Sequence, residues 1–255
     1  MSKFFFKDKP IIGLDISSTG IKVMSIDSKR WLVNGYGSLD LDPLKMKESL
    51  ENPENTFLVD NLKQLLNEKV LGSVSSKRVA IALPTARSYT RTFTLPASAE
   101  KSLDEAVSLE AEQYIPIPVS TLYIDYQIIE RNRGTLTVLM SAVSKSTVDI
   151  ITKHVDAAGL TPVLIEPSIN SVGRVLTATE GGSLPTVVVD IGPATTDIAI
   201  LDRGSIRVTG GLPIGGNSFT LDIAKKLNIA LENAHQLKVL NGLSAGPRQQ
   251  KLSEA

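Results

Sequence analysis

The sequence predicts an α/β protein built from two related lobes, and two stretches carry that prediction. Residues 11 to 27 read as an apolar strand, a turn of Ser-Ser-Thr-Gly and a second strand with imperfect alternation of apolar and polar residues. Residues 185 to 202 repeat this pattern, with an apolar strand, a turn of small residues and another strand. An internal repeat of one supersecondary unit indicates two halves that close on a common ligand.

Both hairpins combine an aspartate with small hydroxyl residues. Asp15 ends one strand and Asp190 the other, and the turns that follow contain Ser18, Thr19, Thr195 and Thr196. Clustered backbone N–H groups and hydroxyls form a cradle for phosphate oxygens. A carboxylate beside phosphates requires a cation between them, usually Mg²⁺ that keeps most of its waters. Either hairpin alone is typical of an ordinary turn, but the pair resembles the two phosphate loops of the actin, sugar-kinase and heat-shock ATPase superfamily.

The amino-acid composition argues against several classes of function for this protein. Lys plus Arg and Asp plus Glu both number 27 among 255 residues, so the clustered positive charge of a nucleic-acid-binding surface is not expected. The chain has no cysteine, which excludes disulfides, thiolate catalysis and cysteine-based zinc sites. No apolar run approaches the ~18 residues that a membrane span needs. The first ten residues are too short for a signal peptide, and a cytosolic location fits this pattern.

The first lobe is expected to occupy residues 1–85 and 161–184. Its hairpin continues into a third strand over residues 30–39, and residues 41–55 predict a surface loop or a short helix. An apolar stripe then predicts an amphipathic helix, formed by Leu58, Leu62, Leu65 and Leu66 and ended near Gly72. Residues 78–83 read as a buried strand that returns to the sheet.

Residues 86–160 predict an inserted β-α-β-β-α subdomain. An alternating strand precedes a helix over residues 99–114, and prolines then give an extended link to two more strands. Ser146 is expected to cap the last helix. His154 and His235 lack partners at ligand spacing and are interpreted as ordinary surface or boundary histidines.

Residues 185–255 are expected to begin the second lobe, which is incomplete. After its hairpin and a strand at residues 205–209, a Gly-Gly pair precedes a helix that begins near Asn217. Such glycines let a helix N-terminus approach an anion, although a plain glycine turn with a polar cap is an equally good interpretation. Glu166, before Pro167, is expected at a strand end near the cleft between the lobes.

Longer segments resemble one family. The run LEAEQYIPIPVSTLYIDYQII is similar to the inserted-subdomain signature of the PilM family of type IV pilus assembly proteins. Further PilM-like segments follow the family order, namely IIGLDISSTGIKV, IEPSINSV, VVVDIGPATTDIAI and LPIGGNSFTLDIAKKL. The resemblance covers essentially the whole chain. PilM proteins are related to the cell-division protein FtsA, whose small subdomain is inserted at the same point.

The resemblance implies an actin-like (ribonuclease H-like) two-lobed ATPase fold with a small FtsA-like inserted subdomain and an incomplete second lobe. It implies ATP and Mg²⁺ in the cleft, with the metal held by Asp15 and Asp190 through water, and Glu166 as the residue near the attacking water. The implied nucleotide-binding residues are Asp15, Ser17, Ser18, Thr19, Lys22, Asp190, Gly192, Thr195, Thr196, Gly215, Gly216 and Asn217. Ser17 replaces the usual glycine, which predicts looser phosphate contact or a strained backbone.

The resemblance also implies a partner, the cytoplasmic N-terminal tail of a PilN-like membrane protein, docked on the first lobe. The protein would then work in the cytoplasm at the inner face of the inner membrane, without a span of its own. We expect the peptide groove to be lined by the strand at residues 86–96, the Tyr114–Pro118 link and the YIDYQII strand, which carry Tyr89, Arg91, Tyr123 and Tyr126. The alternative is that these aromatic residues only pack the insertion against its neighbour. Apolar surface left bare by the incomplete second lobe predicts self-association.

Two alternatives belong to the same superfamily. One is an FtsA-like cell-division protein, although the C-terminal amphipathic helix of that class is not present. The other is a small-molecule kinase, which needs a substrate-facing base in the insertion, where Glu110, Glu112 and Asp125 look structural. Because no strong general base is evident, catalysis is expected to be at most slow ATP hydrolysis. The sequence leaves polymerisation open.

Overall fold

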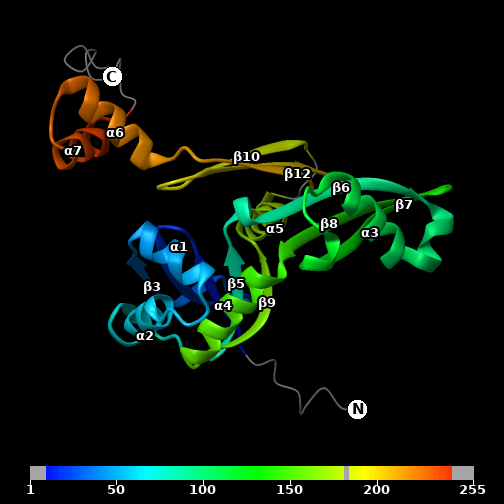
Figure 1. Cartoon of the computed structure of the whole chain (residues 1–255), viewed down its shortest axis with the longest axis horizontal. Coiled ribbons are helices and arrows are strands. Elements are labelled where there is room, and N and C mark those ends of the chain that lie inside the picture. The colour runs from blue at the N-terminus through cyan, green and yellow to red at the C-terminus, as the bar shows by residue number, and fades with distance from the viewer. Residues whose placement is uncertain (1–9, 181–183, 243–255) are drawn as a thin grey trace.

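The computed structural model describes residues 10–180 and 184–242, which form two six-stranded β-sheets with helices packed on them (Figure 1). The first sheet has the strand order β4–β3–β2–β1–β5–β9. Its strands are β1 (Ile12–Ile16), β2 (Gly20–Asp27), β3 (Leu32–Asp40), β4 (Val70–Gly72), β5 (Arg78–Leu83) and β9 (Thr161–Pro167). The second sheet has the order β10–β11–β12–β6–β8–β7. Its strands are β6 (Ser88–Pro96), β7 (Leu122–Asn132), β8 (Thr135–Ser144), β10 (Thr186–Ile191), β11 (Thr196–Asp202) and β12 (Ser205–Leu212).

Helices α1 (Pro43–Glu51), α2 (Phe57–Glu68) and α4 (Lys145–Ala157) cover one face of the first sheet and bury its largest hydrophobic core. The stripe predicted for α2 is present, since Leu58, Leu62 and Leu65 are all buried. The segment expected as a loop or short helix is α1, which begins because the Asp42 carboxylate accepts hydrogen bonds from the next helical N–H groups.

The inserted strands and the second-lobe strands share one sheet. Strand β12 meets β6 through a single register pair, Val208 with Arg91. The Thr92 hydroxyl reinforces this junction by donating to the Ile206 carbonyl oxygen at 2.7 Å. Helix α3 (Leu103–Tyr114) packs on one face of the inserted strands. The domain limits expected from the sequence stay a prediction, but the insertion is joined to both lobes.

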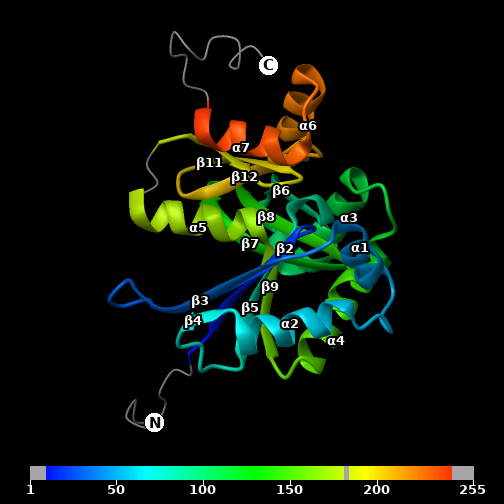
Figure 2. The same ribbon diagram turned by 90° about the vertical axis from the view of Figure 1, so that its left-hand side faces the viewer.

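Helix α5 (Ser168–Glu180) lies between the two sheets, as Figures 1 and 2 show from two directions. It follows β9 directly and packs against β11 and β12 through the buried Ile169, Leu201 and Ile206. Helices α6 (Gly216–Leu227) and α7 (Leu231–Asn241) pack on each other at the far end of β10–β12. Within residues 10–180 and 184–242, no helix is long and apolar enough to cross a bilayer.

Two local expectations were wrong. The cap of α4 is Ser144, one residue before the helix, so Ser146 lies in the first turn and the two hydroxyls hydrogen-bond to each other at 2.8 Å. His154 is not a surface or boundary histidine, because only 2% of it is exposed. Its position on α4 places it among the buried residues of the face that packs on α1 and α2.

Candidate functional site

The first predicted phosphate hairpin is a tight turn closed by Ser17. The Ser17 N–H and hydroxyl both donate to the Gly20 carbonyl oxygen at 2.9 Å. Ser18 and Thr19 lie half-buried at its tip, between β1 and β2. Among the described residues, the non-glycine positions with positive φ are Trp31, Arg203 and Asn228, so Ser17 needs no left-handed backbone. The strain expected from serine at a glycine position is therefore absent.

Four residues in register form a row across the first sheet, Lys22 on β2, Asp15 on β1, Ala82 on β5 and Glu166 on β9. Residues paired in register project to the same face. Neighbouring strands are ~4.8 Å apart, which places Asp15 and Glu166 roughly 10 Å from each other with only the small Ala82 between them. Lys22 Nζ lies 3.7 Å from Asp15 Oδ2. The row thus offers two carboxylates separated by open space.

The second predicted hairpin adds a carboxylate that sequence reasoning missed. Asp190 on β10 and Asp197 on β11 are directly paired in register. In the first hairpin, Asp15 is paired with Lys22, which follows it by the same seven residues. Asp197 therefore occupies the position in the second hairpin that Lys22 occupies in the first. That correspondence is the signal that could have identified it. Two carboxylates opposed across strands repel each other unless a cation or hydrogen bonds compensate them.

Asp197 joins the second lobe to the strand ends of the first. The Thr85 hydroxyl and N–H and the Ser168 hydroxyl, which follow β5 and β9, are the hydrogen-bonding groups that stabilise its carboxylate. Burial raises the pKa of the Asp197 carboxyl, repulsion from Asp190 adds to the increase, and these hydrogen bonds oppose it. Its Oδ1 atom is buried and has no hydrogen-bond partner. A buried, unpaired carboxylate oxygen is an acceptor that a metal-bound water or a cation would satisfy.

Asp15 belongs to the same electrostatic cluster. Burial raises the pKa of its carboxyl, the Lys22 ammonium opposes that change, and repulsion from Asp190 and Asp197 adds to it. Carboxylates from both hairpins therefore act electrostatically on Asp15. Within the described residues, however, no three acidic or histidine side chains lie close enough to ligate one metal ion directly. Contact through metal-bound water suits this spacing.

The Gly-Gly turn before α6 packs against the second hairpin. Gly216 and Asn217 donate their N–H groups to the carbonyl oxygens of Gly192 and Pro193, at 2.9 and 2.8 Å. A Cβ atom at Gly215 would lie 2.5 Å from the Gly192 oxygen, so the close approach requires glycine there. The first N–H groups of α6 are thus engaged by the hairpin in this arrangement.

Hydrogen bonds within the second lobe hold the other predicted residues. The Gly192 N–H donates to the Thr195 carbonyl oxygen at 2.8 Å. The Thr196 hydroxyl donates to the Ile214 carbonyl oxygen at 2.7 Å. The second hairpin and the glycine turn are therefore one cradle, whose role in nucleotide binding stays a prediction.

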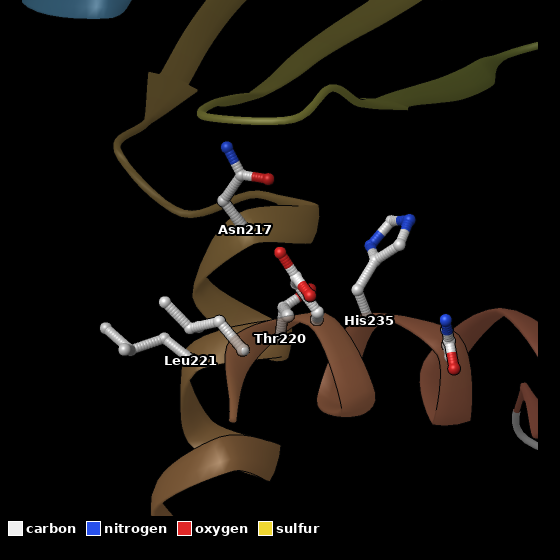
Figure 3. Close-up of a pocket in the computed structure, with 7 residues that line it drawn as sticks. Asn217, Thr220, Leu221 and His235 are labelled. Atoms are coloured by element: carbon white, nitrogen blue, oxygen red, sulfur yellow. The ribbon is translucent and has the colours of Figure 1, made fainter. Parts of the chain in front are cut away.

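A cavity of about 630 Å³ lies between α6 and α7, beside this cradle. Figure 3 shows Asn217 from the start of α6 and His235 from α7 pointing toward the side where the second-lobe strands lie. Glu232 and Gln236 also line the cavity. Lys238 Nζ anchors the two helices by donating to the Gly216 carbonyl at 2.7 Å and to the Thr220 hydroxyl at 2.8 Å. His235, interpreted from the sequence as an ordinary surface or boundary histidine, thus lines a cavity of mixed polar and apolar residues next to the predicted phosphate site.

Glu166 is held by an ion pair. Its Oε1 accepts from the Ser171 hydroxyl at 2.5 Å and from one guanidinium N–H of Arg174, and its Oε2 accepts from another at 2.5 Å. Only 12% of the Glu166 side chain is exposed, against 62% for Arg174. A carboxylate engaged by a bidentate guanidinium is not poised to orient a water molecule. The predicted role of Glu166 near the attacking water remains open and requires this pair to separate.

The aromatic residues expected to line one peptide groove lie on two faces of the second sheet. Tyr89 and Arg91 share the α3 face with Tyr126, and the Arg91 guanidinium stacks over the Tyr114 ring at 3.7 Å. Tyr123 projects from the opposite face, since three positions separate it from Tyr126 along an alternating strand. Tyr89, Arg91, Tyr114 and Ile115 do line one cavity, of about 360 Å³, whereas Tyr123 lies outside it.

A different groove, of about 540 Å³, lies on the face that Tyr123 shares. Its walls are β7 and β8 of the second sheet, the end of β9, and α5. Among the described residues, β7 and β9 are edge strands of their sheets. Asn170 lies in this groove with its Oδ1 buried and unpaired, while its Nδ2 donates to Ser141 at 3.1 Å.

Comparison with known proteins points to one family. The family model described as type IV pilus assembly protein PilM matches residues 13–252. A solved structure titled PilM-PilN type IV pilus biogenesis complex is similar in fold, with a TM-score of 0.75 and 23% identity, over 91% of this chain and 70% of that one. The ethanolamine utilization protein EutJ from Carboxydothermus hydrogenoformans gives a TM-score of 0.51 at 18% identity, over 91% of this chain and 62% of that one.

Cell division protein FtsA from Pseudomonas aeruginosa is 35% identical over 159 residues, which are 56% of this chain and 37% of that protein. FtsA from Neisseria meningitidis is 31% identical over 104 residues, 40% of this chain and 25% of that protein. The chain thus matches between 25% and 37% of the length of these relatives. The fold is the actin-like ATPase fold that the sequence predicted.

Proposed function

The chain belongs to the PilM family of type IV pilus assembly proteins, and from that premise we propose that it is an ATP-binding scaffold that captures the N-terminal tail of a PilN-like membrane protein. In this proposal it acts at the cytoplasmic face of the inner membrane through that partner. Any ATP hydrolysis is slow, because the candidate water-orienting residue, Glu166, is paired with Arg174.

The facing hairpins carry the nucleotide part of the proposal. Asp15 from one lobe and Asp190 and Asp197 from the other form a cluster in which burial and mutual repulsion raise the pKa of Asp15. Such a cluster is unfavourable by itself and suits a bound divalent cation. The unpaired Oδ1 of Asp197 supports the proposal as an acceptor for a metal-bound water.

The positions of the other site residues suggest which part of the nucleotide each would contact. Asp15 and Asp190 would hold Mg²⁺ through water, and the hairpin N–H groups and hydroxyls would bind phosphates, while Lys22 neutralises charge. The cavity between α6 and α7 would receive the nucleoside, with Glu232 as an acceptor for hydroxyl groups. ATP with Mg²⁺ supplies a transferable phosphoryl group when bound.

Calorimetric titration of the full-length protein with ATP and Mg²⁺ tests this proposal. We expect Asp15→Ala and Asp190→Ala each to weaken binding by several kcal/mol, since each carboxylate helps to hold the ion that neutralises the triphosphate. Asp222→Asn, which removes a carboxylate from the exposed side of α6, is the matched control. Wild-type affinity in both cluster variants would exclude the two-hairpin site.

The groove between β7 and β9 supports the partner part of the proposal. An extended peptide binds by adding main-chain hydrogen bonds to an exposed strand edge and by filling side-chain pockets. Both walls are edge strands, and the Asn170 Oδ1 is a buried acceptor for a peptide N–H. Leu164 on β9, 45% exposed, and Tyr123 on β7, 48% exposed, offer apolar contacts on either side.

Fluorescence polarisation with a labelled N-terminal peptide of the PilN-like partner tests this assignment. Asn170→Leu and Leu164→Asp should weaken binding at least tenfold, because one removes the acceptor and the other charges the wall. Tyr89→Ala, on the opposite face, is the control and should bind as the wild type does. A loss of binding only in Tyr89→Ala would place the peptide on the other face.

A further inference from the structure

The turn between β2 and β3 exposes large apolar side chains at one end of the first sheet. More than half of each of Trp31, Leu32 and Val33 is exposed, and the exposed Ile26 is paired with Val33 in register. Figure 2 shows this turn projecting from the side of the molecule, away from helices α1, α2 and α4. An exposed apolar patch marks a surface that contacts a partner or a membrane.

Trp31 also has a backbone conformation that a large side chain rarely adopts. Its φ of 53° lies in the left-handed region, which favours glycine, asparagine and aspartate. Because most of the side chain lies in solvent, packing in the core does not account for a tryptophan at this position. A strained and exposed aromatic residue points to contact with another molecule.

Basic residues surround the apolar turn. Lys29 and Arg30 lie within it, and its one acidic residue, Asp27, is paired with Arg30 at 2.9 Å. Strand β1 begins where β2 ends, and Lys77 is exposed at this same end, where the preceding serine hydroxyl donates to the Pro10 carbonyl oxygen at 2.6 Å. The nine residues that lead into Pro10 are MSKFFFKDK, three phenylalanines among three lysines.

We propose that this end of the first sheet contacts an anionic phospholipid surface directly. Trp31, Leu32 and Val33 enter the headgroup region, and the basic side chains lie on lipid phosphates. Tryptophan prefers the membrane–water interface, because its ring is apolar and its N–H still finds a polar partner. Lysine and arginine are attracted to anionic headgroups. The lysines favour a lipid surface over a protein partner, because the cores of protein interfaces are depleted of lysine.

Vesicle binding tests this proposal, and Trp31 reports on it because it is the one tryptophan in the sequence. The protein, without its partner, is titrated with vesicles of phosphatidylglycerol and phosphatidylethanolamine, and separately with vesicles of phosphatidylcholine. We expect sedimentation with the anionic vesicles, a blue shift of the Trp31 emission and quenching of that emission by brominated lipid. Binding to phosphatidylcholine should be at least about tenfold weaker, because the basic residues then lose their anionic partners.

Two substitutions, each with a matched control, test the turn itself. Trp31→Asn removes the ring and suits the left-handed backbone, so the variant should melt no earlier than the wild type while its vesicle affinity falls at least about tenfold. Leu109→Asn on α3 is the control, since Leu109 and Trp31 are both 62% exposed. Lys29→Gln should weaken binding roughly fivefold, the effect of one positive charge near an anionic surface. Lys63→Gln, on the exposed side of α2, should bind as the wild type does.

Three results would overturn the inference. One is a wild type that does not bind anionic vesicles, or Trp31→Asn binding them with wild-type affinity. Another is sedimentation with no change in the Trp31 emission, which would place the lipid contact on a different surface. The third is an emission shift caused by the soluble partner peptide and not by vesicles, which would make this end a protein interface. The nucleotide and groove variants of the proposed function are measured without vesicles, so its success or failure is decided separately.

Discussion

Replacing Asp197 by asparagine should stabilise the protein while it weakens nucleotide binding. The Asp197 carboxylate is 8% exposed, faces Asp190 across the hairpin, and has one oxygen without a partner. Asparagine keeps an oxygen that can accept the hydrogen bonds from Thr85 and Ser168. Its amide would take the place of the unpaired oxygen and could donate to Asp190.

The magnitude follows from these contacts. Like charges directly opposed across two strands cost roughly 0.2–1 kcal/mol, and burying a charged rather than a neutral group adds to that cost. We expect a gain of about 1 kcal/mol at pH 7, which raises the melting temperature by about 2–4 °C for a chain of this size. Nucleotide-site residues often carry such unfavourable charge, because the ligand compensates it.

The pH dependence gives the prediction a second readout. Folding raises the pKa of Asp197, so its protonated form favours the native state and the unfavourable contribution disappears at low pH. The difference in melting temperature between the variant and the wild type should be full near pH 7. It should close as the pH falls through the raised pKa toward the unfolded value of 3.8. Scanning calorimetry from pH 7 to 4 measures it, with Asp222→Asn as control. A variant less stable than the wild type at pH 7, or a difference that does not change with pH, would refute this reasoning.

Two further predictions concern packing and a buried histidine. Gly215→Ala should cost roughly 1–3 kcal/mol and weaken ATP binding, because its Cβ would lie 2.5 Å from the Gly192 oxygen. Gly210→Ala, where a Cβ meets nothing within 4 Å, should change neither quantity in melting and titration experiments. Burial lowers the pKa of the His154 imidazole below its ordinary 6.5. The buried neutral imidazole therefore stabilises the folded protein above pH 6.5, and this contribution is lost as the pH falls through the lowered pKa. Urea midpoints between pH 7.5 and 5 should therefore fall less steeply in His154→Leu than in the wild type, whereas His235→Leu, on the exposed side of α7, should follow the wild type.

Much of the local architecture could be predicted because it depends on short-range patterns. The helix stripe through Leu58 and Leu62 follows the 3.6-residue period, and the hairpin after Asp15 follows from alternation and small turn residues. The junction of β6 with β12 could not be predicted in this way. It rests on one register pair between residues far apart in the chain, Val208 and Arg91, and neither strand carries a local signal for its neighbour.

The candidate site shows the same division between local and long-range information. The carboxylates of Asp15 and Asp190 stand out because each ends an apolar strand before a polar turn. Asp197 lies inside a strand and acquires its role only when the register sets it opposite Asp190 and the lobes bring it to Thr85 and Ser168.

The peptide groove likewise depends on strand faces rather than on composition. Tyr123 and Tyr126 look alike in the sequence, yet alternation sends them to opposite sides of the sheet, and only the Tyr123 side meets β9 and α5. A site assembled between two sheets is therefore set by register, and its residues are identified by the partners that register gives them.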